Sequence, residues 1–276
     1  MVKKINQILL HLFLLVFVIA AIIPFINMIT VSLIPNAYVL PTKPQILPET
    51  ISFINYIQIW QRESFARFFL NSVFVSVFTT VLTMLISSLS AYGFARFRFP
   101  GKKIIFNLYL FSLMTPAVLA IISQFTILNK LHLIDTYTGL LLLYVSAGIA
   151  GNTFFLKGYF ETVPKELEES VIIEGGNRWT IFRHIMIPLT KPALGVMSIG
   201  VFTGTWMEVF TALIVISSKE KRTLPIAMKL LQNGKATEWG LVFAAAVIIL
   251  IPIILIFIIF NKHFIRRSGS EGAVKG

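Results

Sequence analysis

Residues 239–261 read WGLVFAAAVIILIPIILIFIIFN and contain no charged side chain. An apolar run needs about 20 residues to cross the hydrocarbon core of a bilayer as a helix, so this stretch predicts a transmembrane helix. Five earlier windows are likewise almost free of charged residues: Ile5–Thr42, Phe68–Ala95, Ile104–Asn129, Thr136–Leu156 and Pro192–Ser218. We therefore predict an all-α membrane protein with six transmembrane helices.

The composition agrees with a membrane protein and excludes several soluble classes. The chain has 276 residues, of which 56% are hydrophobic and 13% are charged, and its mean hydropathy is +0.83. So few polar residues could not cover the surface of a soluble enzyme, and disorder requires the opposite composition. The absence of cysteine excludes a disulfide scaffold, a thiolate zinc site, an iron–sulfur cluster and cysteine catalysis.

The Lys and Arg residues indicate which ends of the spans face the cytoplasm. With the amino terminus inside, fifteen of the 24 fall in cytoplasmic segments, so both termini are predicted to be cytoplasmic. The apolar sequence from Ile8 to Ile34 has no clear small-residue cleavage site, which predicts a retained first helix rather than a signal peptide. The net charge of +12 then reflects topology and attraction to the lipid bilayer. Because no compact basic domain is present, we expect no nucleic-acid partner.

The sequence also lacks the residues that would supply energy for transport. It has no phosphate-binding pattern G-x-x-x-x-G-K-S/T, and its four histidines are too scattered to suggest a metal site. We therefore expect no metal, no cofactor and no enzymatic activity in this chain. No acid–base pair lies inside the spans, although such a pair is the usual sign of an ion-coupled carrier. A partner must supply energy, and a passive channel or an ion-coupled secondary carrier remains the alternative.

The predicted cytoplasmic segment Lys157–Lys191 has features of two short helices. Pro164 suits the first turn of a helix whose amino end carries Glu166, Glu168 and Glu169, and Gly175-Gly176 would end that helix. Asn177 is then placed to cap a second segment, which we expect to lie along the membrane surface and to end at Pro188. In the first helix Leu167 and Val171 fall on one side, whereas Ile172 and Ile173 point elsewhere. Such a loop is either a solvated connection or a docking helix, and its many apolar residues favour docking.

A sequence motif in this loop resembles that of a known family. Glu169-Ser170-Val171, Gly175 and Ile185-Met186-Ile187-Pro188 match the pattern E-A-A-x(3)-G-x(9)-I-x-L-P of ABC-importer permeases in spacing, with conservative departures at Ser170, Val171 and Ile187. The similarity extends to the carbohydrate-uptake branch and to the shorter membrane subunit of maltose-type transporters. The further matching segments are Arg96–Lys102, Val163–Gly176, Thr205–Glu208, Arg222–Pro225 and Gly272–Gly276. Met207 departs from the asparagine of many relatives.

The resemblance implies a type I ABC importer permease fold in a bacterial plasma (inner) membrane. Residues 1–276 would form a single permease domain with a core at about 68–262 and a cytoplasmic tail at 262–276. A coupling helix between the fourth and fifth spans would seat in a cleft of an ATPase subunit. The ATPase-coupling residues would be Glu166, Leu167, Glu169, Ser170, Val171, Glu174, Gly175, Gly176, Ile185 and Pro188.

The resemblance also implies the partners. They would be a second related permease subunit, two cytoplasmic ATP-binding subunits that hold ATP and Mg, and an extracytoplasmic solute-binding protein that delivers a sugar or oligosaccharide. Another solute such as glycerol phosphate is the alternative substrate. The tail residues Gly272, Ala273, Val274, Lys275 and Gly276 would reach between the ATPase subunits, although their composition alone would indicate disorder.

Glu208 is the single charged residue inside the six windows, and we place it near the middle of the fifth. A charge there costs about 2.5–3.5 kcal/mol on insertion scales, so it must face protein or water or be protonated. It either lines the substrate path, with Trp206 as a stacking surface for a sugar ring, or forms a buried hydrogen bond between helices.

Overall fold

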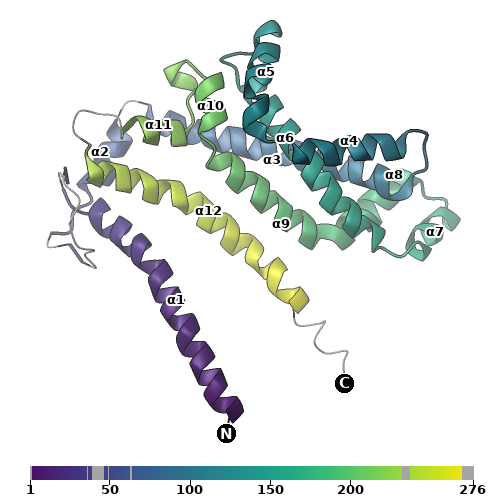
Figure 1. Ribbon diagram of the computed structural model, residues 1–276, viewed down its shortest axis with the longest axis horizontal. Helices are drawn as coiled ribbons and strands as arrows, with labels where there is room; N and C mark the ends of the chain where they lie inside the picture. The colour runs from purple at the N-terminus through teal and green to yellow at the C-terminus, as the bar shows by residue number, and fades with distance from the viewer. Residues whose placement is uncertain are drawn as a thin grey trace. The chain divides into compact units, whose positions relative to one another are not determined.

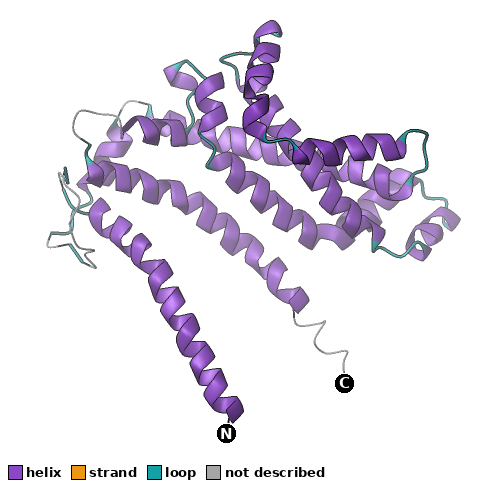
Figure 2. Cartoon of the chain, viewed as in Figure 1, coloured by secondary structure: helices purple, strands orange, loops and turns teal. Residues whose placement is uncertain are grey.

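The computed structural model describes residues 2–35, 37–38, 47–48, 50–62, 64–231 and 237–268. The predicted tail contact at Gly272–Gly276 lies outside them. The described residues contain helices and no strand, which confirms the all-α prediction (Figure 2). The chain divides into two compact units. The first is Met1–Ala66 with Leu224–Pro252, and the second is Arg67–Thr223 with Ile253–Gly276.

The first unit is built around a long apolar helix. Its elements are α1 (Val2–Ser32), α2 (Ile54–Gln61), α11 (Leu224–Leu231) and the beginning of α12 (Trp239–Ser268) (Figure 1). The Asn55 amide donates to the carbonyl oxygens of Ser32, the last residue of α1, and of Ile34, which follows the helix, each at 2.8 Å. Along α1 the apolar side chains are exposed, from 62% at Ile8 to 45% at Ile23, as expected for a helix that faces lipid.

The second unit carries most of the remaining helices. They are α3 (Phe65–Arg96), α4 (Lys102–Met114), α5 (Ala117–Lys130), α6 (Tyr137–Glu161), α7 (Glu166–Ile173), α8 (Arg178–Ile181), a π-helical turn (Phe182–Met186), α9 (Ile187–Trp206), α10 (Phe210–Val215) and a 3-10 turn (Lys219–Lys221). Its α7 and α8 form the loop that the sequence analysis singled out (Figure 1).

Within the described residues, five helical segments are long and apolar enough to span a membrane. They are Asn6–Ser32, Phe65–Arg96, Tyr137–Glu161, Arg178–Trp206 and Trp239–Ile259. The bent pair Lys102–Met114 and Leu119–Lys130 brings the number to six if it counts as one span. The six apolar windows of the sequence therefore correspond to five helical segments and one broken one.

The third window differs from the straight helix expected for Ile104–Asn129. The path of the chain bends by 113° between its two halves, Lys102–Met114 in α4 and Leu119–Lys130 in α5. Thr115 and Pro116 both have extended backbone, with ψ of 121° and 123°. Proline lacks the amide needed for helical hydrogen bonding and disfavours helical geometry in the residue before it, so the helix ends at Met114 and restarts at Ala117.

The fifth window also differs from the expectation. We expected a surface segment ending at Pro188 and a span over Pro192–Ser218, but the chain is helical without interruption from Arg178 to Trp206. The Ile187 amide bonds to the Phe182 carbonyl, five residues back, which makes the intervening turn wider than an α-turn. This wide turn accommodates the Pro188 ring, which would clash with the preceding turn of a regular helix. The span therefore begins earlier than expected and ends before Glu208.

An apolar core at one end of the second unit supports the loop. It joins α3, α6, α8 and the π turn through Met84, Ala91, Tyr92, Leu156, Phe160, Val163, Ile181, Phe182 and Met186. Val171 of α7 and Ile185 of the π turn pack against this core. The two short helices of the loop therefore rest on the ends of spans.

Candidate functional site

The end of α7 is closed by two glycines that have different roles. Gly175 has φ of +81°, a left-handed conformation that side chains disfavour. Its amide bonds to Ile172 O at 3.0 Å and the Gly176 amide bonds to Val171 O at 2.8 Å, the paired bonds of a Schellman motif. A Cβ on Gly176 would lie 2.5 Å from Val171 Cγ1 and 2.9 Å from its carbonyl oxygen. The helix stop expected from Gly175-Gly176 is confirmed.

The following helix, α8, begins with the cap that the sequence predicted. Asn177 Oδ1 accepts hydrogen bonds from the Thr180 amide at 2.9 Å and from the Thr180 hydroxyl at 3.1 Å. Side-chain caps of this kind stabilise a helix by about 1 kcal/mol. The carboxyl end of α7 and the amino end of α8 are both capped, and these hydrogen bonds restrain the turn between them.

The two sides of α7 differ sharply in exposure. Glu168 is 5% exposed, and Val171 packs against the core. Three apolar side chains are left exposed: Leu167 at 40%, Ile172 at 47% and Ile173 at 86%. We call these three, together with the exposed Glu166, Glu169, Ser170 and Glu174, the outward face of α7.

The predicted ATPase-coupling residues do not all lie on this face. Leu167 and Val171, expected on one side, differ in burial because Val171 packs inward. Ile185 also packs against the core, Gly176 is half-buried and Pro188 is exposed at the start of α9. Ile172 and Ile173, absent from the predicted set, are the most exposed apolar residues of α7. Their departure from the main apolar stripe of the helix is the signal that could have identified them.

The inward side of α7 carries an ion pair that the sequence analysis missed. Arg96, the last residue of α3, pairs through Nε with Glu168 Oε1, and both side chains are 6% exposed. Arg96 Nη2 also donates to Val163 O at 2.5 Å. Arg178 of α8 completes the cluster, with Nη1 at 3.6 Å from Glu168 Oε2. Nothing in the local spacing of the sequence indicates that Arg96 and Glu168 meet.

Glu208 lies at a break between helices and not in the middle of a span. It follows the end of α9, and its two carboxylate oxygens accept hydrogen bonds from the amides of Thr211 at 2.7 Å and Ala212 at 3.1 Å. The Tyr144 hydroxyl of α6 donates to Oε2 at 2.5 Å. The carboxylate therefore caps the amino end of α10 and links it to α6.

Trp206 does not offer the stacking surface that we expected. It is 1% exposed, and its ring stacks on Phe202 with centroids 5.6 Å apart and meets the edge of Phe69 at 5.7 Å. A ring covered in this way packs the interior of the second unit. In this structure it presents no open face to a sugar.

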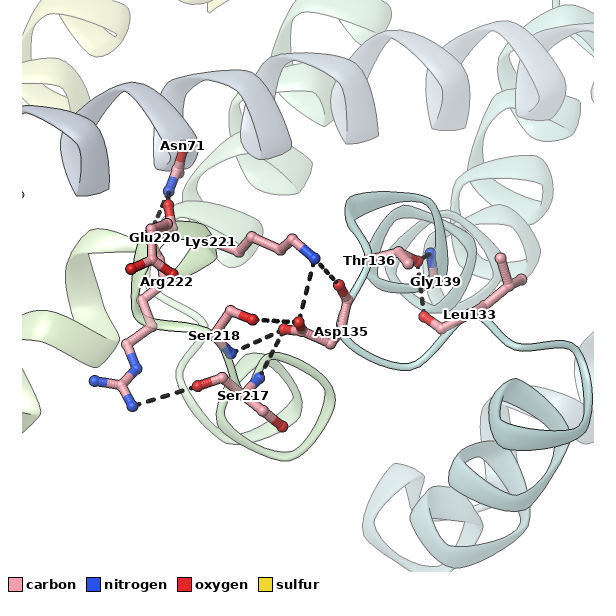
Figure 3. Close-up of polar contacts among 10 residues, drawn as sticks. All are labelled: Asn71, Leu133, Asp135, Thr136, Gly139, Ser217, Ser218, Glu220, Lys221 and Arg222. Carbon is pink, nitrogen blue, oxygen red and sulfur yellow. Dashed lines mark hydrogen bonds and ion pairs between the residues drawn. The ribbon is translucent and has the colours of Figure 1, made fainter.

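A second polar cluster, centred on Asp135, joins the segment between α5 and α6 to the segment after α10 (Figure 3). Asp135 Oδ1 accepts from the amides of Ser217 at 3.0 Å and Ser218 at 2.9 Å, and Oδ2 accepts from the Ser218 hydroxyl. Lys221 Nζ lies 3.2 Å from Oδ2. The Ser218 hydroxyl above all, with these amides and Lys221, holds the pKa of Asp135 well below its ordinary value despite partial burial.

The Asp135 cluster also reaches α3. Asn71 donates to the carbonyl oxygens of Glu220 at 2.8 Å and Arg222 at 2.9 Å. The 3-10 turn is thereby tied both to α3 and to the segment before α6 (Figure 3). The sequence analysis did not identify this cluster, because its residues come from three separate regions of the chain.

Comparison with known proteins identifies the class of this protein. The family described as "Binding-protein-dependent transport system inner membrane component" matches residues 83–269, and the chain belongs to this family. It is thus the membrane-spanning translocation subunit of an ABC transporter, located in the inner membrane. This confirms the family that the loop motif indicates.

Two relatives cover most of the chain. The arabinooligosaccharides transport system permease protein AraQ of Bacillus subtilis is 36% identical over 230 residues, which are 83% of this chain and 81% of AraQ. The diacetylchitobiose uptake system permease protein NgcG of Streptomyces coelicolor is 30% identical over 267 residues, which are 96% of this chain and 88% of NgcG.

A solved structure has the same fold. In the crystal structure of a bacterial ABC transporter involved in the import of the acidic polysaccharide alginate, one chain is 25% identical to this one, with a TM-score of 0.83. The match covers 95% of this chain and 97% of that chain. The type I permease fold expected from the resemblance is therefore confirmed.

Proposed function

We propose that this chain translocates a sugar or oligosaccharide across the inner membrane, delivered by an extracytoplasmic solute-binding protein and driven by two cytoplasmic ATP-binding subunits. The observation that carries the proposal is the outward face of α7. It presents exposed apolar side chains on a short helix whose carboxyl end is closed and whose inner side is packed against a core.

The outward face is suited to docking because it combines exposed apolar area with a fixed shape. Burying one isoleucine or leucine side chain contributes about 1.5–3 kcal/mol of favourable free energy, and a side chain left in water does not gain it. Ile173, 86% exposed, gains nothing from its own chain. A partner cleft on an ATPase subunit would supply the missing contacts, and the rigid turn would pass the partner's movement to the spans instead of absorbing it.

The other partners follow from the family. A second, related permease subunit would complete the translocation path, and the ATPase subunits would bind ATP and Mg. The tail at Gly272–Gly276 would reach between the ATPase subunits. The exposed apolar side chains of α1 suit contact with the bilayer.

The proposed substrate class rests on the relatives named for arabinooligosaccharides and diacetylchitobiose. Glycerol phosphate, the alternative within the same class of importer, would be favoured if the cognate solute-binding protein bound it in place of sugars. Measuring which solutes that binding protein retains decides between the two.

The docking role is tested with paired variants of the loop. Leu167→Gln and Ile173→Asn should each reduce co-purification of the ATPase subunits with the permease by about tenfold, the factor that corresponds to about 1.4 kcal/mol. ATP-driven uptake is then measured with the complete transporter in proteoliposomes. Arg183→Gln, an exposed residue of the π turn, is the control and should leave assembly unchanged. Normal assembly and ATP-driven uptake in both outward-face variants would contradict docking of the ATPase subunits through the outward face of α7.

A further inference from the structure

We infer that Arg96 and Glu168 form a strut that transmits the movement of α7 to α3, which makes Arg96 a positioning residue for coupled transport. The inference rests on the proposed function, because it takes α7 to be the helix that an ATPase subunit moves. It adds the route by which that movement enters the membrane-spanning part of the chain.

The burial of Glu168 is the first observation behind the strut. The first turn of α7 carries three glutamates, Glu166, Glu168 and Glu169. Glu166 and Glu169 are exposed, whereas Glu168 is turned inward and its side chain is 6% exposed. A glutamate near the amino end of a helix interacts favourably with the helix dipole even when its side chain is in water. That interaction therefore does not explain why Glu168 is buried.

Arg96 joins three segments through a single guanidinium group. Its own backbone ends α3, its Nε pairs with Glu168 of α7, and its Nη2 donates to the Val163 carbonyl in the segment between α6 and α7. The Nη2 contact with Val163 is a hydrogen bond, whereas the Nε contact with Glu168 is a close ion pair without hydrogen-bond geometry. Because both charges are buried, the pair restrains α7 against separation from α3.

A second contact fastens α8 to the same end of α3. The Tyr92 hydroxyl, one turn before Arg96, donates to Arg178 O at 3.3 Å. Arg178 in turn lies 3.6 Å from the Glu168 carboxylate. The last turns of α3 thus hold both short helices of the loop.

A buried ion pair is a poor choice if stability alone is required. Its Coulomb attraction is largely offset by the cost of removing both charges from water, and apolar residues of similar volume often serve as well or better. The apolar core begins next to the pair, because Val163, whose carbonyl oxygen accepts from Arg96, belongs to it. Apolar side chains do not supply a contact between two specific groups, because hydrophobic burial is non-directional.

The position of the strut suits transmission. It acts at the last residue of α3, a candidate membrane span of 32 residues. A helix is a stiff rod with a rise of about 1.5 Å per residue, so a displacement at its end is carried along about 48 Å. Movement of α7 would in this way reach the depth of the membrane through α3.

The test uses the complete transporter in proteoliposomes and a double variant that removes both charges together. Arg96→Met/Glu168→Leu avoids leaving one charge buried without its partner. The matched control is Arg98→Met/Glu161→Leu, which removes an exposed arginine and an exposed glutamate from the same region with the same change in net charge. The readouts are co-purification of the ATPase subunits, ATP hydrolysis with and without the binding protein, and sugar taken up per ATP.

We expect the strut variant to retain the ATPase subunits but to transport at least about tenfold less sugar per ATP than the control. Arg96→Lys, which keeps the charge but cannot make both contacts, should fall between the two. A ratio of sugar to ATP equal to the control in the double variant would overturn the inference. Loss of co-purified ATPase subunits to the level of the outward-face variants would also overturn it, since the pair would then only shape the docking surface.

The outcome is separable from that of the proposed function. If Leu167→Gln and Ile173→Asn abolish docking while the strut variant couples normally, the docking proposal stands and the strut fails. If the outward-face variants have no effect, the proposed function itself fails.

Discussion

Tyr144 of α6 donates a hydrogen bond from its hydroxyl to Glu208 Oε2, 2.5 Å away, at the point where the helix ending in Trp206 gives way to α10. The same carboxylate caps the first amides of α10. Both oxygens of the carboxyl group therefore have hydrogen-bond donors. This arrangement explains how a chain with so few charged residues keeps an acid between two apolar helices.

The first prediction concerns this carboxylate. Glu208→Leu leaves two amides and the Tyr144 hydroxyl without their acceptor, at about 1–3 kcal/mol for each buried group, so assembly and melting temperature should fall. Glu208→Gln keeps one oxygen acceptor and should fall between Glu208→Leu and the wild type. Thermal unfolding of the purified complexes checks the order. Equal melting temperatures for Glu208→Leu and the wild type would contradict the capping role.

Sugar uptake by Glu208→Gln adds a separate decision. If that variant assembles but its uptake falls while ATP hydrolysis continues, the charge itself takes part in the transport path. Uptake equal to the wild type per assembled complex would limit Glu208 to the cap and the Tyr144 contact.

The second prediction concerns the turn after α7. Gly175→Val places a β-branched residue at φ of +81°, a strain of about 1–2 kcal/mol, and should misdirect α7 so that coupled uptake falls. Insertion into the membrane should persist, because the spans do not depend on this turn. Gly158→Ala, at a position of α6 with open space around the Cβ, is the control and should be neutral. Normal uptake by Gly175→Val would mean that the turn geometry has no part in coupling.

The third prediction concerns the pH dependence of the Asp135 cluster. Because the folded-state pKa is lowered, the ionised cluster stabilises the fold fully above the ordinary aspartate pKa of about 3.9 and loses that effect as the pH falls toward the lowered value. The difference in melting temperature between the wild type and Asp135→Asn should be constant from about pH 5 to 8. It should shrink below about pH 4. A difference that grows on acidification would reverse the sign and contradict the cluster.

The fourth prediction concerns the carboxyl-terminal tail. Deleting Glu271–Gly276 should leave all spans inserted and lower the ATP hydrolysis that the binding protein stimulates. The reason is that the contacts of the tail with the two ATPase subunits would be lost. Hydrolysis and uptake by the truncated chain in proteoliposomes provide the measurement. Unchanged ATP hydrolysis and uptake would contradict this contact and favour a disordered tail, as its composition indicates.

Local signals in the sequence predicted a large part of the structure. Runs of uncharged residues predicted the spans, since burial in lipid requires them, and Gly175-Gly176 and Asn177 predicted the helix ends, since their backbone and capping preferences act within a few residues. The effects of Pro116 and Pro188 on the helices could not be predicted from local sequence. A helix ends before Pro116, whereas Pro188 lies within a continuous helical segment because a wide π turn precedes it.

The candidate site likewise has parts that local sequence predicts and parts that it does not. The position of the loop and the place of its glutamates at the amino end of α7 could be predicted, because they depend on a contiguous stretch of sequence; the burial of Glu168 could not. The contacts of Arg96 with Glu168, of Glu208 with Tyr144 and of Asp135 with Ser218 could not, because each joins distant parts of the chain and is selected by packing. The burial of Trp206 follows in part from the same cause: Phe202 lies one turn earlier in α9, but Phe69, the other covering ring, comes from α3.

The most direct test of the account uses the absence of cysteine from the chain. A single Ile173→Cys substitution places one thiol on the outward face of α7, and its labelling by a water-soluble maleimide is measured in the permease alone and in the assembled transporter. The account predicts rapid labelling in the permease alone, strong protection on assembly, and cross-linking of this thiol to an ATPase subunit. Equal labelling in both states, with no cross-link, would contradict the claim that α7 is the site at which ATP hydrolysis drives sugar import.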